Sequence, residues 1–152
     1  TLDTKKAKIS KRSHGEIVAV QFYRDNGFIP WAFNNFLALL GWSAGNDQEF
    51  FTKEDLIDQF SLDRINKSSA IFNYRKNDPK FFTDPKAIYI NEHYLRTMDI
   101  NDLGELVRQE LQADGLWDDS YAGDRKQWYL DTLDMIRDRF HTLKDFTTLG
   151  RA

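Results

Sequence analysis

The residues best suited to chemistry form a short basic run near the start of the chain. The run consists of Lys8, Ile9, Ser10, Lys11 and Arg12. Its two ammonium groups, hydroxyl and guanidinium can converge on a polyphosphate if the segment folds around it. When a triphosphate is attacked at its α-phosphorus, negative charge develops on the leaving pyrophosphate, and fixed cations stabilise that transition state more than the ground state. Taken alone, these residues fit a solvated basic tail or a weak nucleic-acid patch more simply.

Composition limits the classes of protein that this chain can belong to. Its 152 residues are 41% hydrophobic and 14% aromatic, which suffices for one ordinary domain or two small ones with a real core. Lysine and arginine total 21 against 24 acidic residues, a net charge of −3, so any RNA contact has to come from a local patch. The sequence contains no cysteine, which excludes disulfides and thiolate metal sites. No apolar run approaches the roughly 18 residues of a membrane span.

The basic run resembles the second signature motif of class I aminoacyl-tRNA synthetases, in the variant form of the bacterial and organellar glutamyl-tRNA synthetases. In that form lysine, an aliphatic residue, serine, lysine and arginine are followed by a His-Gly pair; here Ser13 stands before His14 and Gly15. Further blocks resemble segments of the same family in the same order: 27–30, 34–43, 50–60, 67–72 and 90–96. The resemblance predicts a fragment from the C-terminal half of such an enzyme, beginning just before the KMSKS-type signature.

The resemblance implies a role for each signature residue. Lys8 and Lys11 match the lysines that bind the ATP phosphates and stabilise the pyrophosphate while glutamate is activated to its adenylate. Ile9, Ser10 and Arg12 match the remaining positions of the ATP-binding motif. ATP would be a substrate, used with Mg²⁺ in the full-length enzyme, and no metal site or bound cofactor is expected on the fragment. The first signature motif and the nucleotide-binding sheet are absent from this sequence, so the isolated fragment is expected to be inactive.

The resemblance also divides the chain into three parts. Residues 1–15 would be the KMSKS-type loop at the end of the catalytic domain, 16–98 a stem-contact helical unit, and 99–152 the start of an anticodon-binding helical domain. The expected partner is tRNA(Glu), and the protein would act as a monomer in the cytoplasm, without a membrane. The candidate RNA contacts are Lys67, Arg75, Lys76 and Lys80. An ordinary solvated charge is the alternative for each of them.

Two alternatives to a glutamate-specific ligase stay open. One is a non-discriminating synthetase that also charges tRNA(Gln). The other is a non-catalytic, synthetase-like helical module that binds RNA. Retention of both signature lysines favours an enzyme over such a module.

Hydrophobic spacing and cap residues predict a mainly α fold for residues 16–98. Pro30 suits the first position of a helix that Gly41 would end in the left-handed conformation. Thr52, with an acidic residue three positions later, and the Asp84–Pro85 pair predict two more helix starts. Residues 16–24 are β-branched enough for a strand, but the resemblance favours a short helix. The aromatic residues of this region are expected in the core; they are Trp31, Phe33, Phe36 and Trp42.

Two helices with apolar stripes, and a final short helix capped by Thr142, are predicted in residues 99–152. The first carries an amphipathic stripe and ends at Gly115; the stripe is Leu103, Leu106, Val107 and Leu111. The second begins near Asp124, and its stripe is Tyr129, Leu133, Ile136 and Phe140. The sequence thus predicts a multi-helical unit followed by the opening of an α-helical bundle.

Overall fold

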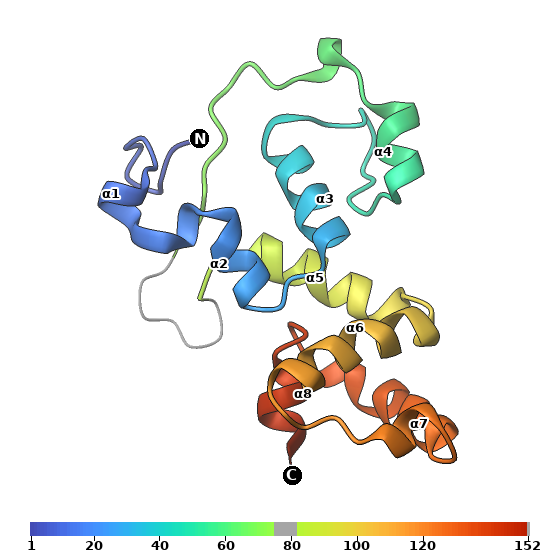
Figure 1. The fold of residues 1–152 in the computed structure, drawn as a ribbon. Helices are drawn as coiled ribbons and strands as arrows, with labels where there is room; N and C mark the ends of the chain where they lie inside the picture. Colours follow the sequence, from blue (N-terminus) through green and yellow to red (C-terminus); the bar gives the residue numbers. More distant parts are fainter. Residues whose placement is uncertain (75–81, 152) are drawn as a thin grey trace. The chain divides into compact units, whose positions relative to one another are not determined.

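The computed structural model describes residues 1–74 and 82–151 and shows a mainly helical chain (Figure 1), which confirms the predicted fold class. The chain forms two compact units, Thr1–Ile90 and Asn91–Ala152. The division falls inside helix α5 (Pro85–Thr97), ahead of the boundary expected after residue 98. Assignment of these units to stem contact and anticodon binding stays a prediction. No described helix is long and apolar enough to cross a membrane.

Short helices separated by turns make up the first unit. Before α5, its described helical elements are α1 (Lys11–His14), η1 (Gly15–Val18), α2 (Val20–Asp25), α3 (Pro30–Gly41), α4 (Lys53–Gln59) and η2 (Leu62–Arg64). Pro30 opens α3 as predicted. Thr52 and Asp55 form the expected capping box at α4, each side chain bonded to the other's backbone N–H. The helix expected at 16–24 is confirmed as η1 and α2, so burial of apolar side chains outweighs β-propensity there.

Buried aromatic rings form the core of the first unit. The ring of Tyr23 packs against Phe28 and Phe33, at centroid distances of 5.1 and 4.3 Å. Its hydroxyl shares a 2.7 Å hydrogen bond with the buried Thr83, just before α5. Burial raises the pKa of Tyr23 to about 12, so this hydroxyl stays protonated at neutral pH. The tyrosine therefore ties α2 to the start of α5 through both packing and a buried hydrogen bond.

Two of the expectations for this unit are wrong. Gly41 is the last residue of α3 and does not take the left-handed conformation, because the chain leaves α3 through an extended Trp42. Trp31 was expected in the core, but it is 45% exposed and has the Lys53 ammonium 5.2 Å from its ring centroid. An aromatic residue in the first turn of a helix can lie on the solvent side when a lysine covers its face.

The second unit is a small helical bundle. After α5, its described helical elements are α6 (Ile100–Ala113), η3 (Asp119–Ala122), α7 (Lys126–Ile136), η4 (Arg137–Arg139), α8 (Asp145–Thr148) and η5 (Leu149–Arg151). Gly115 has φ +68° just beyond α6, as the predicted helix end requires. Helix α7 packs on α6 at Gly104, where the Tyr129 hydroxyl donates a 2.7 Å hydrogen bond to the glycine carbonyl. A larger residue at this position would meet Leu130, since an added Cβ would lie 2.8 Å from its side chain.

Phe140 does not belong to the stripe of α7, as the sequence had suggested. The helix ends at Ile136, and Phe140 follows η4 in extended conformation. Its ring packs edge-on against Phe146 of α8 at 4.7 Å, which buries both. The predicted stripe is confirmed for Tyr129 and Leu133, which are buried residues of α7, whereas Phe140 lies beyond this helix and packs on α8.

Asn35 in α3 tests how much a buried side-chain hydrogen-bond bridge contributes to the stability of the first unit. The side chain is fully buried, donates to the Glu49 carbonyl at 2.9 Å and accepts from the Phe51 N–H at 2.9 Å. The change Asn35→Ala leaves two backbone groups without these bonds, so we expect the free energy of unfolding to fall by about 2 kcal/mol. Urea denaturation followed by far-UV circular dichroism measures this change.

The exposed neighbour Asn34 supplies the matched control. Asn34→Ala replaces the same residue type in the same helix, and its effect should stay within about 0.5 kcal/mol. Equal effects of the two substitutions would contradict a bridging role for Asn35.

Candidate functional site

The basic run lies in residues 1–15, here called the arm. Backbone hydrogen bonds hold the arm to the rest of the first unit. The N–H of Leu2 donates to the Ala70 carbonyl at 2.8 Å, and the Leu2 carbonyl accepts from the Phe72 N–H at 2.8 Å. On its other side Leu2 forms an isolated antiparallel bridge with Lys8. The expected loop over residues 1–15 is therefore partly paired, and Lys8 lies at a defined place in it.

Asp3 shapes the turn that leads into the signature. One carboxylate oxygen accepts hydrogen bonds from the N–H groups of Lys5 at 2.9 Å and Ala7 at 2.7 Å. The Asp3 N–H in turn donates to the Ala7 carbonyl at 2.8 Å. An aspartate that accepts bonds from the backbone a few residues ahead is a standard way of closing a turn. The turn includes Lys6 with φ +63°, a left-handed conformation that this bonding supports.

Ser10, Ser13 and His14 form a hydrogen-bonded group at the start of α1. The Ser10 hydroxyl caps this helix by accepting from the Ser13 N–H at 3.3 Å, and the two hydroxyl oxygens lie 2.7 Å apart. His14 Nδ1 lies 3.2 Å from the Ser10 N and 2.8 Å from the Ser13 hydroxyl. His14 Nε2 lies 3.2 Å from the second carboxylate oxygen of Asp3. The group thus connects both ends of the arm.

The cations of the signature point into solvent. Lys8, Lys11 and Arg12 are all exposed. Lys11 pairs with Glu16 at 3.4 Å, with the two side chains 62% and 73% exposed, whereas Lys8 and Arg12 make no ion pair among the described residues. An exposed pair contributes at most about 1 kcal/mol, so a polyphosphate can replace Glu16 at little cost. These three side chains are available to an anion.

The remaining predicted site residues differ in what the structure says of them. Ser10 is exposed and caps α1, and Ile9 is half-buried in the arm. Lys67 is exposed in the segment after η2, as an RNA contact would need. The other RNA candidates, Arg75, Lys76 and Lys80, lie outside the described residues. In the ranges 1–74 and 82–151 no three histidine or acidic side chains gather as metal ligands.

Sequence reasoning did not assign any role to Asp3 or to the ring of His14. The two residues are eleven positions apart, and only the folded turn brings the carboxylate to the imidazole. A signal was present, because aspartate followed by polar residues and a small one typically opens a turn. That signal predicts the backbone bonds of Asp3 but not its contact with His14.

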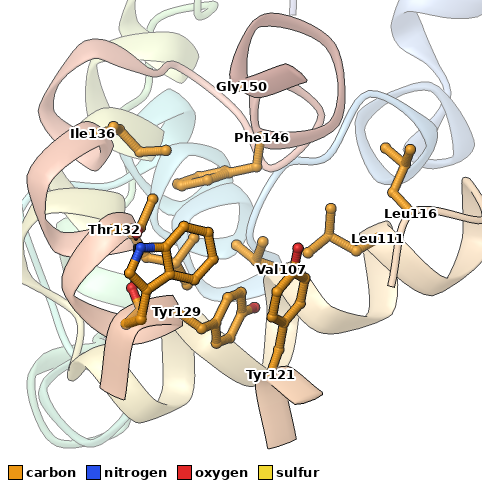
Figure 2. Close-up of a pocket in the computed structure, with 11 residues that line it drawn as sticks. Val107, Leu111, Leu116, Tyr121, Tyr129, Thr132, Ile136, Phe146 and Gly150 are labelled. Atoms are coloured by element: carbon orange, nitrogen blue, oxygen red, sulfur yellow. Dashed lines mark hydrogen bonds between the residues drawn. The ribbon is translucent and has the colours of Figure 1, made fainter. Parts of the chain in front are cut away.

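A pocket of about 250 Å³ lies in the second unit (Figure 2). The rings of Tyr121, Tyr129 and Phe146 face it, together with aliphatic side chains from α6 and α7. The Tyr129 hydroxyl is already bonded to Gly104, and burial raises the pKa of this tyrosine. No carboxylate, imidazole or basic group is among the described residues that line the pocket. Its lining therefore offers no acid–base chemistry, and the basic arm is the better candidate.

The chain has relatives among known families. Residues 1–79 match the family model described as tRNA synthetases class I (E and Q), catalytic domain. The chain is 76% identical over all 152 residues to a glutamate–tRNA ligase of Desulfotalea psychrophila, covering 31% of that protein. It is 36% identical over 140 residues, 92% of the chain, to a glutamate–tRNA ligase of Moorella thermoacetica, covering 26% of that one. The chain thus spans about a third or less of the length of these relatives.

Solved structures show the same fold. A glutamate tRNA ligase from Elizabethkingia meningosepticum, crystallised in complex with its amino acid, superposes with a TM-score of 0.73 at 24% identity. The superposition covers 99% of this chain and 30% of that one. A glutamate–tRNA synthetase from Elizabethkingia anophelis gives a TM-score of 0.69 over 96% of the chain and 29% of its own, also at 24% identity.

The turn at Asp3 predicts an acid-sensitive arm. The hydrogen bond from the Ala7 N–H, the largest contribution, holds the pKa of the Asp3 carboxyl below its ordinary value of 3.8. Because the pKa is lowered on folding, this carboxylate stabilises the arm above pH 3.8 and ceases to do so as pH falls through the lowered value. In an NMR titration, the Ala7 amide proton should move with a midpoint below 3.8.

The variant Asp3→Asn serves as the control, because it removes the titrating carboxyl and should abolish that movement. A midpoint at or above 3.8 in the unsubstituted chain would contradict the bonding of Asp3 to the Ala7 backbone.

Proposed function

This chain belongs to the family of class I tRNA synthetases for glutamate and glutamine, and on that premise we propose that it is part of a ligase that activates glutamate with ATP and attaches it to tRNA(Glu). The observation that carries the proposal is the exposed cationic signature on an arm whose backbone is held by hydrogen bonds. The 76% identity to a glutamate–tRNA ligase over the whole chain supports it independently.

The arm contributes to the first chemical step. A carboxylate oxygen of glutamate attacks the α-phosphorus of ATP, the bond to the bridging oxygen breaks, and pyrophosphate leaves with the charge that develops. The ammonium groups of Lys8 and Lys11, with the Arg12 guanidinium, stabilise that charge, and the Ser10 and Ile9 positions contact the nucleotide. Mg²⁺ would supply further positive charge in the complete enzyme. Cations held near the leaving group before the reaction lower the barrier most, since they need no rearrangement.

The helical units serve the second substrate, tRNA(Glu). We assign residues 16–98 to contact with the tRNA stem and residues 99–152 to the start of the anticodon-binding domain. Lys67 is the described candidate for a phosphate contact, and Arg75, Lys76 and Lys80 complete the proposed set. The net charge of −3 makes such local contacts necessary, because the body as a whole does not attract RNA. The ligase would work as a monomer in the cytoplasm.

The decisive experiment uses a complete enzyme. The 152 residues replace the matching segment of the Desulfotalea ligase, and glutamate-dependent exchange of pyrophosphate into ATP is measured with tRNA(Glu) present. We expect the chimera to be active and Lys11→Ala to lose roughly 10²–10³-fold in kcat, the cost of one charge-stabilising donor.

Lys5→Ala is the matched control, an exposed arm lysine outside the signature whose substitution should leave the rate nearly unchanged. A folded chimera that binds tRNA(Glu) without any exchange would favour a non-catalytic RNA-binding module. Charging of tRNA(Gln) at a comparable rate would indicate a non-discriminating enzyme.

A further inference from the structure

We infer that Asp3 and His14 are positioning residues that hold the signature backbone in the shape which presents Lys8 and Lys11 to the ATP phosphates. The inference rests on the proposed function for the reaction concerned, but its structural part stands on the hydrogen bonds of the arm. The two side chains touch neither cation in any described hydrogen bond or ion pair, so they act through the backbone.

The roles of the His14 ring nitrogens follow from its partners. Nδ1 faces the backbone N–H of Ser10 at 3.2 Å, and a backbone N–H can only donate. Nδ1 is therefore the acceptor, and the ring proton of the neutral imidazole sits on Nε2. That proton points to the carboxylate of Asp3, 3.2 Å away, which can only accept while ionised. Asp3 thus selects the tautomer that lets His14 bind the Ser10 N–H.

Both sides of Lys8 are held by this arrangement. Ala7, the residue before it, donates its N–H to Asp3 at 2.7 Å, and Ser10, two residues after it, donates its N–H to His14. Lys8 itself bridges to Leu2. Three interactions, at Ala7, Lys8 and Ser10, therefore fix the path of the backbone through Lys8.

Lys11 is positioned through the same histidine. It is the first residue of α1, and Ser10 is the cap of that helix. The His14 N–H donates to the Ser10 carbonyl at 2.9 Å, while the His14 ring accepts the Ser10 N–H, so one residue binds both backbone groups of the cap. With an ordered backbone beneath them, the lysine side chains lose less freedom on meeting the phosphates. Both His14 and Asp3 are largely shielded, at 11% and 19% side-chain exposure, which fits a supporting role better than contact with a ligand.

The test uses the chimeric ligase and measures pyrophosphate exchange. We expect His14→Ala to lower kcat about tenfold while KM for ATP changes less than about threefold. The reason is that the lysines would be less well aligned with the phosphates in the transition state, while binding of ATP in the ground state changes little. His14→Asn should recover most of the rate, since its Oδ1 is attached to Cγ as Nδ1 is and can accept the Ser10 N–H. Asp3→Asn keeps an acceptor for the Ala7 N–H but presents an amide donor to Nε2–H, so it should lose about as much as His14→Ala.

A combination with Lys8→Ala and Lys11→Ala separates positioning from general structure. If His14 acts through these two lysines, His14→Ala should cost less than about twofold more when both are already replaced. Overturning results are an unchanged kcat for His14→Ala, or the same tenfold factor with and without the two lysines.

A readout without activity keeps the inference independent of the proposed function. Hydrogen exchange of the Ser10 amide should quicken in His14→Ala and Asp3→Asn, and His93→Ala, outside the arm, should leave this amide as it is. If the unsubstituted chimera shows no exchange of pyrophosphate, the proposed function fails, while amide protection still decides the arrangement of Asp3 and His14. An unprotected Ser10 amide in the unsubstituted enzyme would overturn the inference.

Discussion

Two backbone hydrogen bonds of Leu2 connect the chemistry of this chain to its fold. A segment of fifteen residues rich in lysine has too little apolar surface to form a core, so its order has to come from elsewhere. Leu2 bonds to Ala70 and Phe72, and Phe72 is buried with its ring 6.4 Å from that of Phe36 in α3. The aromatic core therefore fixes the position of the arm backbone, and the arm backbone fixes where the lysine and arginine side chains begin.

Charge is distributed in keeping with this arrangement. The chain as a whole is slightly acidic, and some of its basic side chains form ion pairs within the described residues, such as Lys144 with Glu110 at 2.6 Å and Lys86 with Glu49 at 2.8 Å. The cations of the signature, Lys8, Lys11 and Arg12, are exposed, and Lys11 has only a solvent-screened partner. A weakly paired cation on an ordered backbone is what a charge-stabilising group needs, since a strong internal partner would compete with the phosphate.

Sequence reasoning succeeded where the determining interactions are local. Pro30, Thr52 with Asp55, and Gly115 marked helix ends correctly, because capping depends on neighbours within one turn. The predictions for Gly41 and Phe140 were wrong because these conformations depend on contacts beyond one helical turn. Trp42, which follows Gly41, packs against Phe51, and Phe140 packs against Phe146. The signature residues are predicted from residue type and resemblance, and their role stays a prediction, whereas the bond between Asp3 and His14 required the folded turn.

Ser13 changes the spacing between the basic run and His14. Its presence puts His14 four positions after Ser10, the spacing at which a helical N–H reaches a carbonyl and a side chain lies over the preceding turn. The same spacing brings Nδ1 to the Ser10 N–H, and the Ser13 hydroxyl fills the gap between Ser10 and the ring. Without this residue the histidine would stand three positions after Ser10 and approach the cap from another direction. The extra residue is therefore compatible with an ordered backbone at the lysines, because it places the His14 ring where Nδ1 accepts the Ser10 N–H.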